Sequence, residues 1–485
     1  MGSFTFKKWN TILGWFVFSI ALVTYWSTVE PTASFWDAGE YITTASNLEV
    51  GHPPGAPLYQ LMGAFFSIFA MEATNIALTI NLMSVFASAF TILFMFWSVT
   101  ILLSNLVKKN DTLNKNNQIA ILGSAVVASL TFAFTDSFWY SAVEAEVYAM
   151  AAFIMSVLFY AGLRWEGEMF TPRGDKWVVL IAFVIGLSFG VHFMGLLTIP
   201  AIGFLYFFKN YNKVTVKNFL IANVVTVAIL LFIFKLLLPM TLRFFSAAEI
   251  FFVNQINMPF NSGTTIAGLL FLAVFYFGLR YTRSKSFVKL NTLLLCVLFI
   301  FIGFSSWLML PIRANAGTVI NENNPNNARE LLAYYNREQY PETHLFYGPL
   351  FTEAYVGLDE DNKFLDDKPK YEKDLKANKY VIVNDIQNAK QNFEDNQKAF
   401  LPRMWSLEHN ANYMEITGAV DFEIKNEYRS EQLLVDEVAK FRQAYDKGLV
   451  DSEDYDKFLK NFGDYLDIEK PGFLTNMRFM FEYQF

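Results

Sequence analysis

The sequence predicts a polytopic α-helical membrane domain followed by a soluble domain. Of the 485 residues, 54% are apolar and only 17% are charged, which is unusual for a soluble protein. Several apolar runs reach or approach the roughly 20 residues that a helix needs to cross a bilayer. After Leu310 the composition becomes ordinary and acidic residues outnumber basic ones. We therefore expect a transmembrane domain over residues 1–312 and a mixed α/β soluble domain over residues 313–485.

The apolar runs predict about nine membrane spans. The first, residues 9–26, follows two lysines, which places the N-terminus in the cytoplasm. It has no clear small-residue cleavage site, so we expect no cleavable signal peptide. The next run, residues 56–71, is short and begins among prolines, so we expect a helix at the outer interface, within an external loop over residues 27–75. The other spans are expected near residues 76–103, 118–134, 147–163, both halves of 177–208 around a turn at 190–192, 219–238, 265–279 and 290–310.

The charges agree with this topology. Every Lys and Arg before Arg313, except Lys235 and Arg243, falls in a segment assigned to the cytoplasm, as the positive-inside rule requires. Nine spans from an inside start place residues 313–485 outside. Most acidic residues of the membrane domain also fall on the outer face. Because acidic residues do little to set topology, their gathering there indicates a functional site.

The soluble domain is predicted to mix helices with short strands. The Asn-rich loop at residues 321–327 is expected to cap a helix that starts at Ala328. Residues 380–383 look like a short buried strand, and residues 430–446 and 452–464 look like amphipathic helices. The only cysteine, which lies in an apolar run, excludes an intrachain disulfide.

The strongest candidate site follows the first span directly. Asp37 and Glu40 are three residues apart, so one helical turn places both carboxylates on one face. Trp36 and Tyr41 flank them, and carboxylates beside apolar surface tend to have raised pKa values, as a general base requires. The alternative is an N-terminal helix cap and a surface charge, and the spacing alone does not separate the two.

Four further candidates are expected on the same face. Glu144 and Glu146 lie at the entry to the fourth span. Two residues that are two positions apart on a helix cannot point the same way. We expect one to face the cavity and the other to bond locally, with interfacial solvation as the alternative. His52 and His192 are expected to contact substrate, or else only to satisfy local hydrogen bonds. No pair has His-x-x-x-His spacing, so the sequence names no metal ligands.

Three cations are also expected on the outer side: Lys235, Arg243 and Arg313. They either snorkel to lipid headgroups or bind a lipid-linked phosphate. Lys235 lies within a span, where an unpaired charge costs about 2.5–3.5 kcal/mol or more. It must therefore snorkel, pair with an acid such as Glu249, or meet an anion. A Walker loop, a Gly-x-Gly-x-x-Gly and a Gly-x-Ser-x-Gly motif are missing, so a nucleotide-driven reaction is unsupported. An acidic external tail also argues against nucleic-acid binding.

Six short motifs in roughly the first 340 residues follow a known pattern. They are Phe-Trp-Asp-Ala-Gly-Glu-Tyr at 35–41, Gly-His-Pro-Pro-Gly-Ala-Pro at 51–57, Glu-Ala-Glu-Val-Tyr at 144–148, Gly-Val-His at 190–192, Arg-Ala-Asn at 313–315 and Ile-Asn-Glu-Asn-Asn-Pro at 320–325. The pattern resembles that of GT-C-fold membrane glycosyltransferases. The closer resemblance is to the bacterial family once listed as domain of unknown function 2723, which is similar to transmembrane-protein-260-type protein O-mannosyltransferases. Because bacterial members are expected to be longer, we expect a short member, a split gene product or a fragment.

The resemblance implies a GT-C-like bundle that transfers a sugar from a polyprenyl-phosphate donor to a Ser or Thr hydroxyl of a protein acceptor. Transfer would occur on the periplasmic face of the bacterial inner membrane. In such enzymes the acid of the first external loop acts as the base or orients the acceptor, a role that falls here to Asp37 with Glu40 in support. Candidates to stabilise the leaving phosphate are His52, His192, Lys235 and Arg243. One of Glu144 and Glu146 would orient sugar hydroxyls or a divalent ion, and no cofactor is fixed.

Two other functions remain open. A transporter or lipid flippase often contains internal repeats with broken helices at the bilayer midplane; here the polar residues crowd one face and no repeat is evident, which favours an enzyme. A non-catalytic subunit of an envelope complex would bind membrane lipid and partner chains, and it would not need the Asp37 loop.

Overall fold

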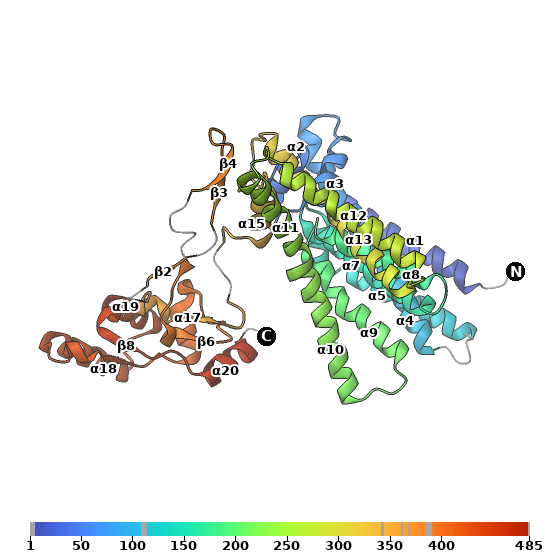
Figure 1. The fold of residues 1–485 in the computed structure, drawn as a ribbon. Helices are drawn as coiled ribbons and strands as arrows, with labels where there is room; N and C mark the ends of the chain where they lie inside the picture. Colours follow the sequence, from blue (N-terminus) through green and yellow to red (C-terminus); the bar gives the residue numbers. More distant parts are fainter. Residues whose placement is uncertain are drawn as a thin grey trace. The chain divides into compact units, whose positions relative to one another are not determined.

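The computed structural model describes residues 5–107, 114–340, 344–359, 362–366, 369–383 and 390–483. The chain divides into two units, Met1–Gln339 and Tyr340–Phe485 (Figure 1). The boundary thus lies further along the chain than the predicted one at residue 312. The reason is that Tyr334 and Tyr335 are buried in the core of the first unit, so the segment around them belongs to the membrane domain.

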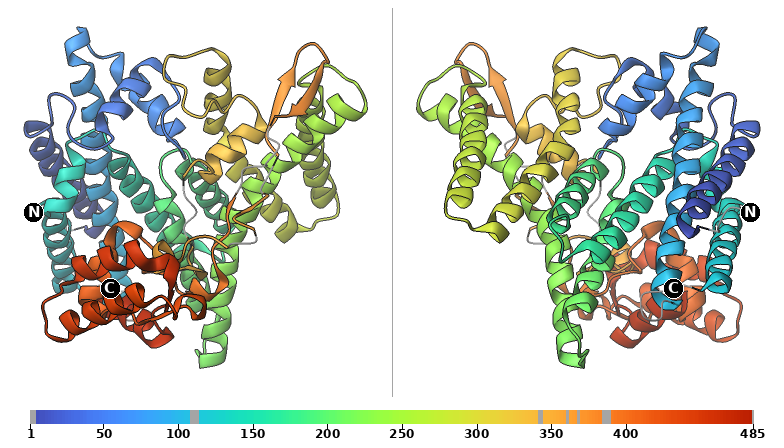
Figure 2. Two further views of the ribbon diagram at one scale, coloured as in Figure 1. Left: turned by 90° about the vertical axis from the view of Figure 1, so that its left-hand side faces the viewer. Right: turned by 90° about the vertical axis from the view of Figure 1, so that its right-hand side faces the viewer.

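Long apolar helices form most of the first unit (Figure 2), which confirms the predicted polytopic α-helical architecture. Within the described residues, eight helices are long and apolar enough to cross a membrane. One more, α8, has 15 residues and packs against α13, which brings the bundle to the predicted number of about nine. The long helices are α1 (Phe6–Ser27), α4 (Ile76–Val107), α5 (Lys115–Ala133), α7 (Val147–Glu168), α8 (Gly174–Ser188), α9 (Thr198–Asn210), α10 (Val216–Leu231), α12 (Ser262–Ser284) and α13 (Val288–Phe304).

One expected helix end is absent. The seventh span was predicted to end at Pro239, but helix continues over residues 216–255, through the π-helical turn η3 (Phe232–Leu237), α11 (Leu238–Ile250) and η4 (Phe251–Gln255). A proline inside a helix removes one backbone donor and crowds the preceding turn. Here Pro239 occupies the first turn of α11, directly after the π turn, where the change of hydrogen-bond register accommodates it.

Short helices lie between the long ones and position the candidate site. The helix predicted within residues 56–71 is confirmed as α3, which Pro57 opens at a position where the missing N–H costs nothing; its place at the interface stays a prediction. The predicted cap of the helix at Ala328 is also confirmed, because the Asn327 side chain accepts hydrogen bonds from two backbone N–H groups of its first turn. The short helices are α2 (Ala38–Asn47), α3 (Pro57–Ser67), η1 (Ala73–Asn75), α6 (Asp136–Ala142), η2 (Phe193–Leu197), η5 (Ser305–Leu308), α14 (Met309–Asn315) and α15 (Ala328–Asn336).

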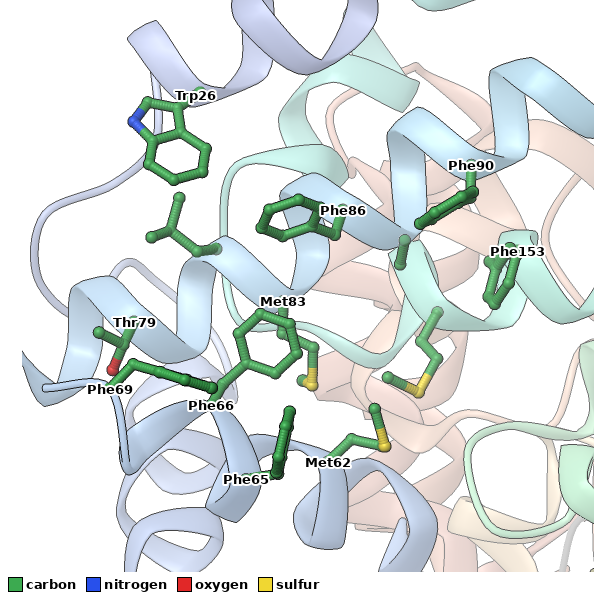
Figure 3. A pocket seen from close by; sticks show the side chains of 13 residues that line it. Trp26, Met62, Phe65, Phe66, Phe69, Thr79, Met83, Phe86, Phe90 and Phe153 are labelled. Carbon is green, nitrogen blue, oxygen red and sulfur yellow. The ribbon is translucent and has the colours of Figure 1, made fainter. Parts of the chain in front are cut away.

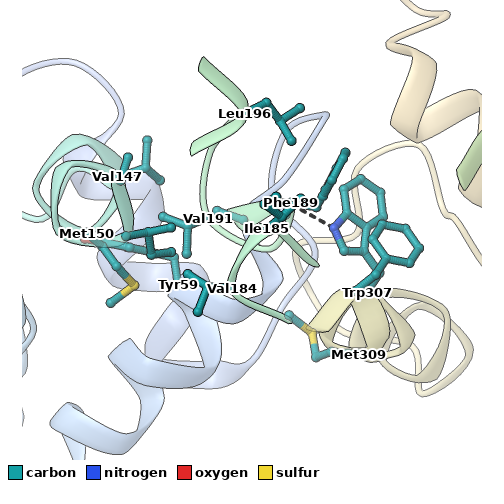
Figure 4. Close-up of a cluster of buried hydrophobic side chains, with 14 of the residues drawn as sticks. Tyr59, Val147, Met150, Val184, Ile185, Phe189, Val191, Leu196, Trp307 and Met309 are labelled. Carbon is teal, nitrogen blue, oxygen red and sulfur yellow. Dashed lines mark hydrogen bonds between the residues drawn. The ribbon is translucent and has the colours of Figure 1, made fainter. Parts of the chain in front are cut away.

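The largest core of the first unit joins α3, α7, α8 and α13 (Figure 4). The Trp307 indole donates a hydrogen bond to the Phe189 carbonyl at 2.8 Å, so this large side chain is buried without an unpaired N–H. Helices α8 and α13 approach closely at Gly186 and Gly303, where an added Cβ would collide with the backbone of the other helix. Small residues at such crossings are typical of membrane helices.

The second unit is a helical domain with four two-stranded antiparallel pairs, β1–β6, β2–β5, β3–β4 and β7–β8. The two predicted amphipathic helices are present as α18 and α19, and Phe441 of one stacks on Phe458 of the other at 3.7 Å. The strand predicted at residues 380–383 exists as β4, but of these residues only Tyr380 is buried. It belongs to a hairpin with β3 rather than to a central sheet, so the expectation of a buried strand is wrong.

The elements of this unit are β1 (Tyr347–Pro349), α16 (Glu353–Val356), β2 (Phe364–Leu365), β3 (Tyr371–Asp374), β4 (Lys379–Ile382), β5 (Lys390–Gln391), β6 (Lys398–Phe400), α17 (Asn410–Thr417), β7 (Phe422–Ile424), α18 (Gln432–Asp446), α19 (Ser452–Phe462), β8 (Leu466–Ile468) and α20 (Phe473–Tyr483).

Candidate functional site

Asp37 stands at the start of α2, on the loop that leaves α1. Trp36 before it has a positive φ of 60° and is 89% exposed, so the chain turns sharply into the helix. Asp37 occupies the N-cap position, yet its side chain makes no capping hydrogen bond. The carboxylate is 57% exposed. The reading of Asp37 as a simple helix cap therefore has no support in the geometry.

His52 lies between the two predicted carboxylates. Glu40 accepts hydrogen bonds from the His52 backbone N–H at 2.6 Å and from Nδ1 at 3.0 Å. The other ring nitrogen, Nε2, is 3.8 Å from Oδ2 of Asp37. Because Nδ1 donates its hydrogen bond to Glu40, Nε2 is the ring nitrogen that remains available to another partner. The structure thus brings together Asp37, Glu40 and His52, whose ligand atoms all lie within 4.8 Å of one another.

The charges of Glu40 and His52 support each other. The hydrogen bond from His52 lowers the pKa of Glu40, although burial opposes this shift. The same bond raises the pKa of His52, again against burial. The expectation that apolar surroundings would raise the pKa of the carboxylates is therefore wrong for Glu40, because a specific hydrogen-bonded partner outweighs desolvation there.

The loop that carries His52 is fixed from several sides. Gly51 has no room for a side chain, since an added Cβ would lie 2.5 Å from Oε1 of Glu40. The Tyr334 hydroxyl donates to the Gly51 carbonyl at 2.5 Å and lies 3.3 Å from the His52 carbonyl. Gly55 has φ of 66°, and a Cβ there would collide with the Tyr334 ring. The position of His52 therefore depends on a residue of α15.

A second set of contacts ties the same loop to the turn after α8. The backbone N–H groups of Leu58 and Tyr59 both donate to the Gly190 carbonyl, at 2.7 and 3.1 Å. On its other side, Val50 pairs with residues 320–322, since its N–H donates to the Ile320 carbonyl and its carbonyl accepts from the Glu322 N–H, both at 3.0 Å. This loop, itself one of the six motifs, thus contacts three of the others, at residues 35–41, 190–192 and 320–325.

Glu144 and Glu146 bind the segment that leads into α2. Oε2 of Glu144 accepts a hydrogen bond from Ser34 at 2.7 Å, and Oε1 of Glu146 accepts one from the Asp37 backbone N–H at 3.1 Å. Both glutamates are buried and precede α7 rather than lie on it. The expectation that helical geometry would turn them apart is therefore wrong: both bond to the same loop.

Glu146 is the carboxyl group with the unusual environment. Burial, followed by the negative charge of Asp37, raises its pKa to about 7. Desolvation disfavours the charged form and a nearby like charge adds to the effect. Perturbed carboxyl groups of this kind gather at functional sites, so Glu146 joins the cluster around Asp37.

His192 occupies the N-cap position of η2. Its Nδ1 accepts a hydrogen bond from the Met194 N–H at 3.2 Å, so in the neutral ring the proton is on Nε2. The ring packs on Tyr148 with centroids 5.6 Å apart. Burial lowers the pKa of His192, which favours the neutral form.

Lys235 and Arg243 are both exposed and lie on the 216–255 helix. Nζ of Lys235 lies 4.9 Å from the centre of the Phe234 ring, and Lys235 forms no ion pair within the described part of the chain. Glu249, the acid considered as its partner, accepts hydrogen bonds from the backbone N–H groups of Asn261 and Thr264 at the start of α12.

Arg313 has a structural role instead. Its Nε donates to the Leu48 carbonyl at 2.5 Å and its Nη2 to the Asn47 carbonyl at 3.1 Å. Carbonyl groups at the end of a helix lack intrahelical partners, and cations are favourable there. Arg313 therefore caps the end of α2, whose first turn carries Glu40.

An apolar cavity of about 550 Å³ lies between α3 and the long helices α1, α4 and α7 (Figure 3). Side chains of α1, α3, α4 and α7 line it, among them Trp26, Phe66, Phe86 and Phe153. Its wall offers aromatic rings and methionines, so hydrocarbon is the ligand chemistry that it fits.

Sequence reasoning missed several residues that shape the site. Tyr334 lies 283 residues from the carbonyl that it binds, and no local pattern reveals such a contact. Ser34 directly precedes the motif at residues 35–41, but its hydrogen bond to Glu144 spans 110 residues of the chain. Only Gly51 gave a signal, because a glycine next to a motif histidine marks a close approach of the chain.

Two parts of the chain match family models. Residues 37–215 match the Protein O-mannosyl-transferase TMEM260 N-terminal domain. Residues 341–481 match a family of unknown function, DUF8416. The first stretch contains most of the candidate site residues, namely Asp37, Glu40, His52, Glu144, Glu146 and His192.

Two relatives share the same region. A Protein O-mannosyl-transferase tmem260 of Dictyostelium discoideum is 23% identical over 209 residues, which is 41% of this chain and 23% of the relative. A Protein O-mannosyl-transferase TMEM260 of Mus musculus is 26% identical over 172 residues, 36% of this chain and 22% of the relative. No solved structure matches the chain. These similarities support the resemblance to the TMEM260-type O-mannosyltransferases, over less than a quarter of each relative's length.

Proposed function

We propose that the protein is a membrane glycosyltransferase of GT-C type that moves a sugar, mannose first among the candidates, from a polyprenyl phosphate to a hydroxyl group of a protein. The observation that carries the proposal is the cluster of Asp37, Glu40 and His52, backed by the buried Glu146. It lies in the region similar to named O-mannosyltransferases. The bundle of membrane-spanning candidates suits a lipid-linked donor.

In this mechanism Asp37 takes the proton of an acceptor Ser or Thr hydroxyl. The hydroxyl oxygen forms a bond to C1 of the sugar on the face opposite the phosphate. The bond between C1 and the phosphate oxygen breaks, and the lipid phosphate leaves with its electron pair. Glu40 holds His52 in position. Burial and the negative charge of Asp37 raise the pKa of Glu146, so Glu146 takes up a proton more readily while Asp37 is ionised. The configuration at C1 of the sugar is therefore inverted.

The leaving phosphate needs positive charge and hydrogen-bond donors. His52 supports this role because its pKa is raised. His192 supports it as a neutral donor through Nε2. Lys235 and Arg243 are the exposed cations of the membrane helices on the expected outer side, and Lys235 has no ion pair within the described residues. The apolar cavity beside α3 is our proposed place for part of the hydrocarbon chain.

The orientation is part of the proposal: N-terminus in the cytoplasm, the site and residues 340–485 in the periplasm of a bacterial cell. The second unit would bind the acceptor or cover the site. A lipid flippase is the other candidate, because an apolar cavity beside charged groups also suits lipid movement. An enzyme is favoured, since Asp37, Glu40 and His52 converge within 4.8 Å rather than line a path.

The choice of donor tests the proposal. The purified chain in lipid vesicles would be given radiolabelled mannose either on a polyprenyl phosphate or on a nucleoside diphosphate, together with a periplasmic protein extract. We expect label on protein only with the lipid donor. Transfer from the nucleotide donor alone would contradict the proposal, and movement of the lipid without transfer would favour the flippase.

A further inference from the structure

We propose that Glu146 is a positioning residue for Asp37, whose backbone it holds as a charged hydrogen-bond acceptor without touching the substrate itself. The proposal deepens the proposed function and rests on it. Oε1 of Glu146 accepts a hydrogen bond from the Asp37 backbone N–H at 3.1 Å. Only 5% of Glu146 is exposed, so the protein covers this side chain and does not offer it to a sugar or a peptide.

The segment that carries Asp37 is fixed to the loop before α7 by two further contacts. The Glu30 backbone N–H donates to the Val143 carbonyl at 3.0 Å, and the Ser34 hydroxyl donates to Oε2 of Glu144 at 2.7 Å. The hydrogen bond from Asp37 is the last of the three along the chain, directly before α2. It therefore sets the direction in which the chain enters that helix.

The backbone at Trp36 shows why this last contact matters. Its φ of 60° lies in the left-handed region, which is a genuine outlier for a bulky side chain. Such a conformation persists only where the surrounding contacts hold it. The contacts of Ser34 and Asp37 stand on either side of Trp36. Without the hydrogen bond to Glu146, we expect the backbone at Trp36 to relax and Asp37 to turn with it.

The strength of this contact depends on the charge of Glu146. A hydrogen bond to an ionised carboxylate is roughly twice as strong as one to a neutral acceptor. Four ionisable side chains face Glu146, namely Asp37, Tyr41, Tyr59 and Glu144, and within the described part of the chain no Lys or Arg forms an ion pair with it. Burial, followed by the charge of Asp37, raises the pKa of Glu146 to about 7. The contact therefore weakens as the pH falls through this value.

Repulsion between the two carboxylates acts in the opposite direction, but it is the smaller effect. The carboxylate of Asp37 is 57% exposed, and water and salt screen the charge of an exposed group. The hydrogen bond from the Asp37 N–H is instead a direct contact with a buried carboxylate. We therefore expect the form with ionised Glu146 to be the active one.

The pH profile of sugar transfer tests the proposal. For full-length wild type, Glu146→Gln and Asp136→Asn, kcat and KM for the polyprenyl-phosphate donor would be measured; Asp136 is an exposed acid of α6 outside the cluster. In wild type and in Asp136→Asn, kcat is expected to rise as the pH passes about 7, where Glu146 loses its proton. Glu146→Gln keeps an acceptor oxygen but no charge. Its kcat should stay about tenfold below the wild-type plateau at every pH, with KM unchanged.

Three results would overturn the proposal. The first is a wild-type profile without a step near pH 7. The second is a step that survives in Glu146→Gln, which would belong to another group such as His52, whose pKa the hydrogen bond to Glu40 raises, and would leave Glu146 a structural role only. The third is a raised KM at unchanged kcat in Glu146→Gln, which would mean that Glu146 contacts the donor.

Hydrogen exchange measures the contact without any substrate. Exchange of the peptide that contains the Asp37 N–H, followed by mass spectrometry, should be about tenfold faster in Glu146→Gln than in wild type at about pH 8. At about pH 5.5 the two should exchange alike, because Glu146 is then protonated in wild type as well. Equal exchange at both pH values would overturn the proposal. Wild-type protein that shows the expected exchange but transfers no sugar would count against the transferase function instead, so the two fail separately.

Thermal unfolding gives a third measurement. The pKa of Glu146 is raised above its model value of 4.5, so the folded chain binds the proton more tightly than the unfolded chain. Stability is then lost as the pH rises from 4.5 to about 7. The melting temperature of wild type should fall relative to that of Glu146→Gln over this range. A difference that stays constant with pH would contradict the titration on which the proposed pH profile depends and overturn it.

Discussion

Among single residues, Glu40 organises the candidate site, because it binds His52 through both the backbone and the ring. Asp37 is the exposed group of the cluster and Glu146 the buried one. Tyr334 holds the loop on which His52 stands. Each of these residues acts on the position or the charge of its neighbour, so substitutions in the supporting residues are expected to affect transfer without removing a reacting group.

Tyr334→Phe is expected to lower sugar transfer more than it lowers stability. Loss of one buried hydroxyl costs about 0.5–1.5 kcal/mol in unfolding, and here it also frees the carbonyl groups of Gly51 and His52. Tyr25→Phe is the matched control, because its buried hydroxyl donates to the Ala133 carbonyl at 2.8 Å, away from the loop. Melting temperature and initial transfer rate would be measured for both. Equal transfer rates in the two variants would show that Tyr334 does not position the loop.

Among the elements, the close crossing of α8 and α13 determines where the turn at residues 190–192 lies. Gly186 and Gly303 allow the two backbones to touch, and the Gly190 carbonyl then accepts two hydrogen bonds from the start of α3. The His52 loop precedes α3 directly. Helix packing in the core therefore sets the geometry of the site through a short chain of backbone contacts.

Gly303→Leu is expected to destabilise the protein strongly, because overpacking costs typically 1–3 kcal/mol and backbone collisions cost more. Gly123→Leu in α5 is the control, since a Cβ there meets no atom within 4 Å. Thermal unfolding in detergent compares the two. A melting temperature of Gly303→Leu within a degree of the control would contradict the close crossing.

Lys235 belongs to the π-helical turn η3. Single π turns occur often at functional sites. Lys235→Met is expected to weaken binding of the lipid-phosphate donor about tenfold or more and to leave thermal stability unchanged or higher, because a cation in an apolar segment is costly without an anion. Lys289→Met, at the start of α13, serves as the control. Unchanged donor affinity together with a large loss of stability would assign Lys235 a structural role.

The sequence predicted the helices well because apolar length and turn residues are local signals. It predicted that Asp37 and Glu40 lie close together, because residues three positions apart share one face of a helix. It failed where contacts are distant or where local structure departs from a regular helix. Glu144 and Glu146 precede α7 instead of lying on it, Arg313 caps α2 from 265 residues away, and Pro239 sits within a continuous helix.

At the scale of the whole molecule, the orientation of the chain in the membrane determines whether the Asp37 cluster and the second unit face the same compartment. A reporter that is active only outside the cytoplasm, fused after Gln339, is expected to be active, because an inside start and about nine spans place this point outside. A cytoplasmic reporter at the same position is expected to be inactive. The reverse result would move every proposed site residue to the cytoplasmic face.

The most direct test of the central claim is sugar transfer by Asp37→Asn. Asparagine keeps the size of the side chain but cannot take the acceptor proton, and loss of a general base typically costs about 100- to 10,000-fold. Transfer of labelled mannose from polyprenyl phosphate to protein would be compared in wild type, Asp37→Asn and the control Asp136→Asn, with melting temperatures measured in parallel. The account predicts a loss of at least about 100-fold in Asp37→Asn alone, at unchanged stability. Transfer by Asp37→Asn at the rate of the control would contradict it.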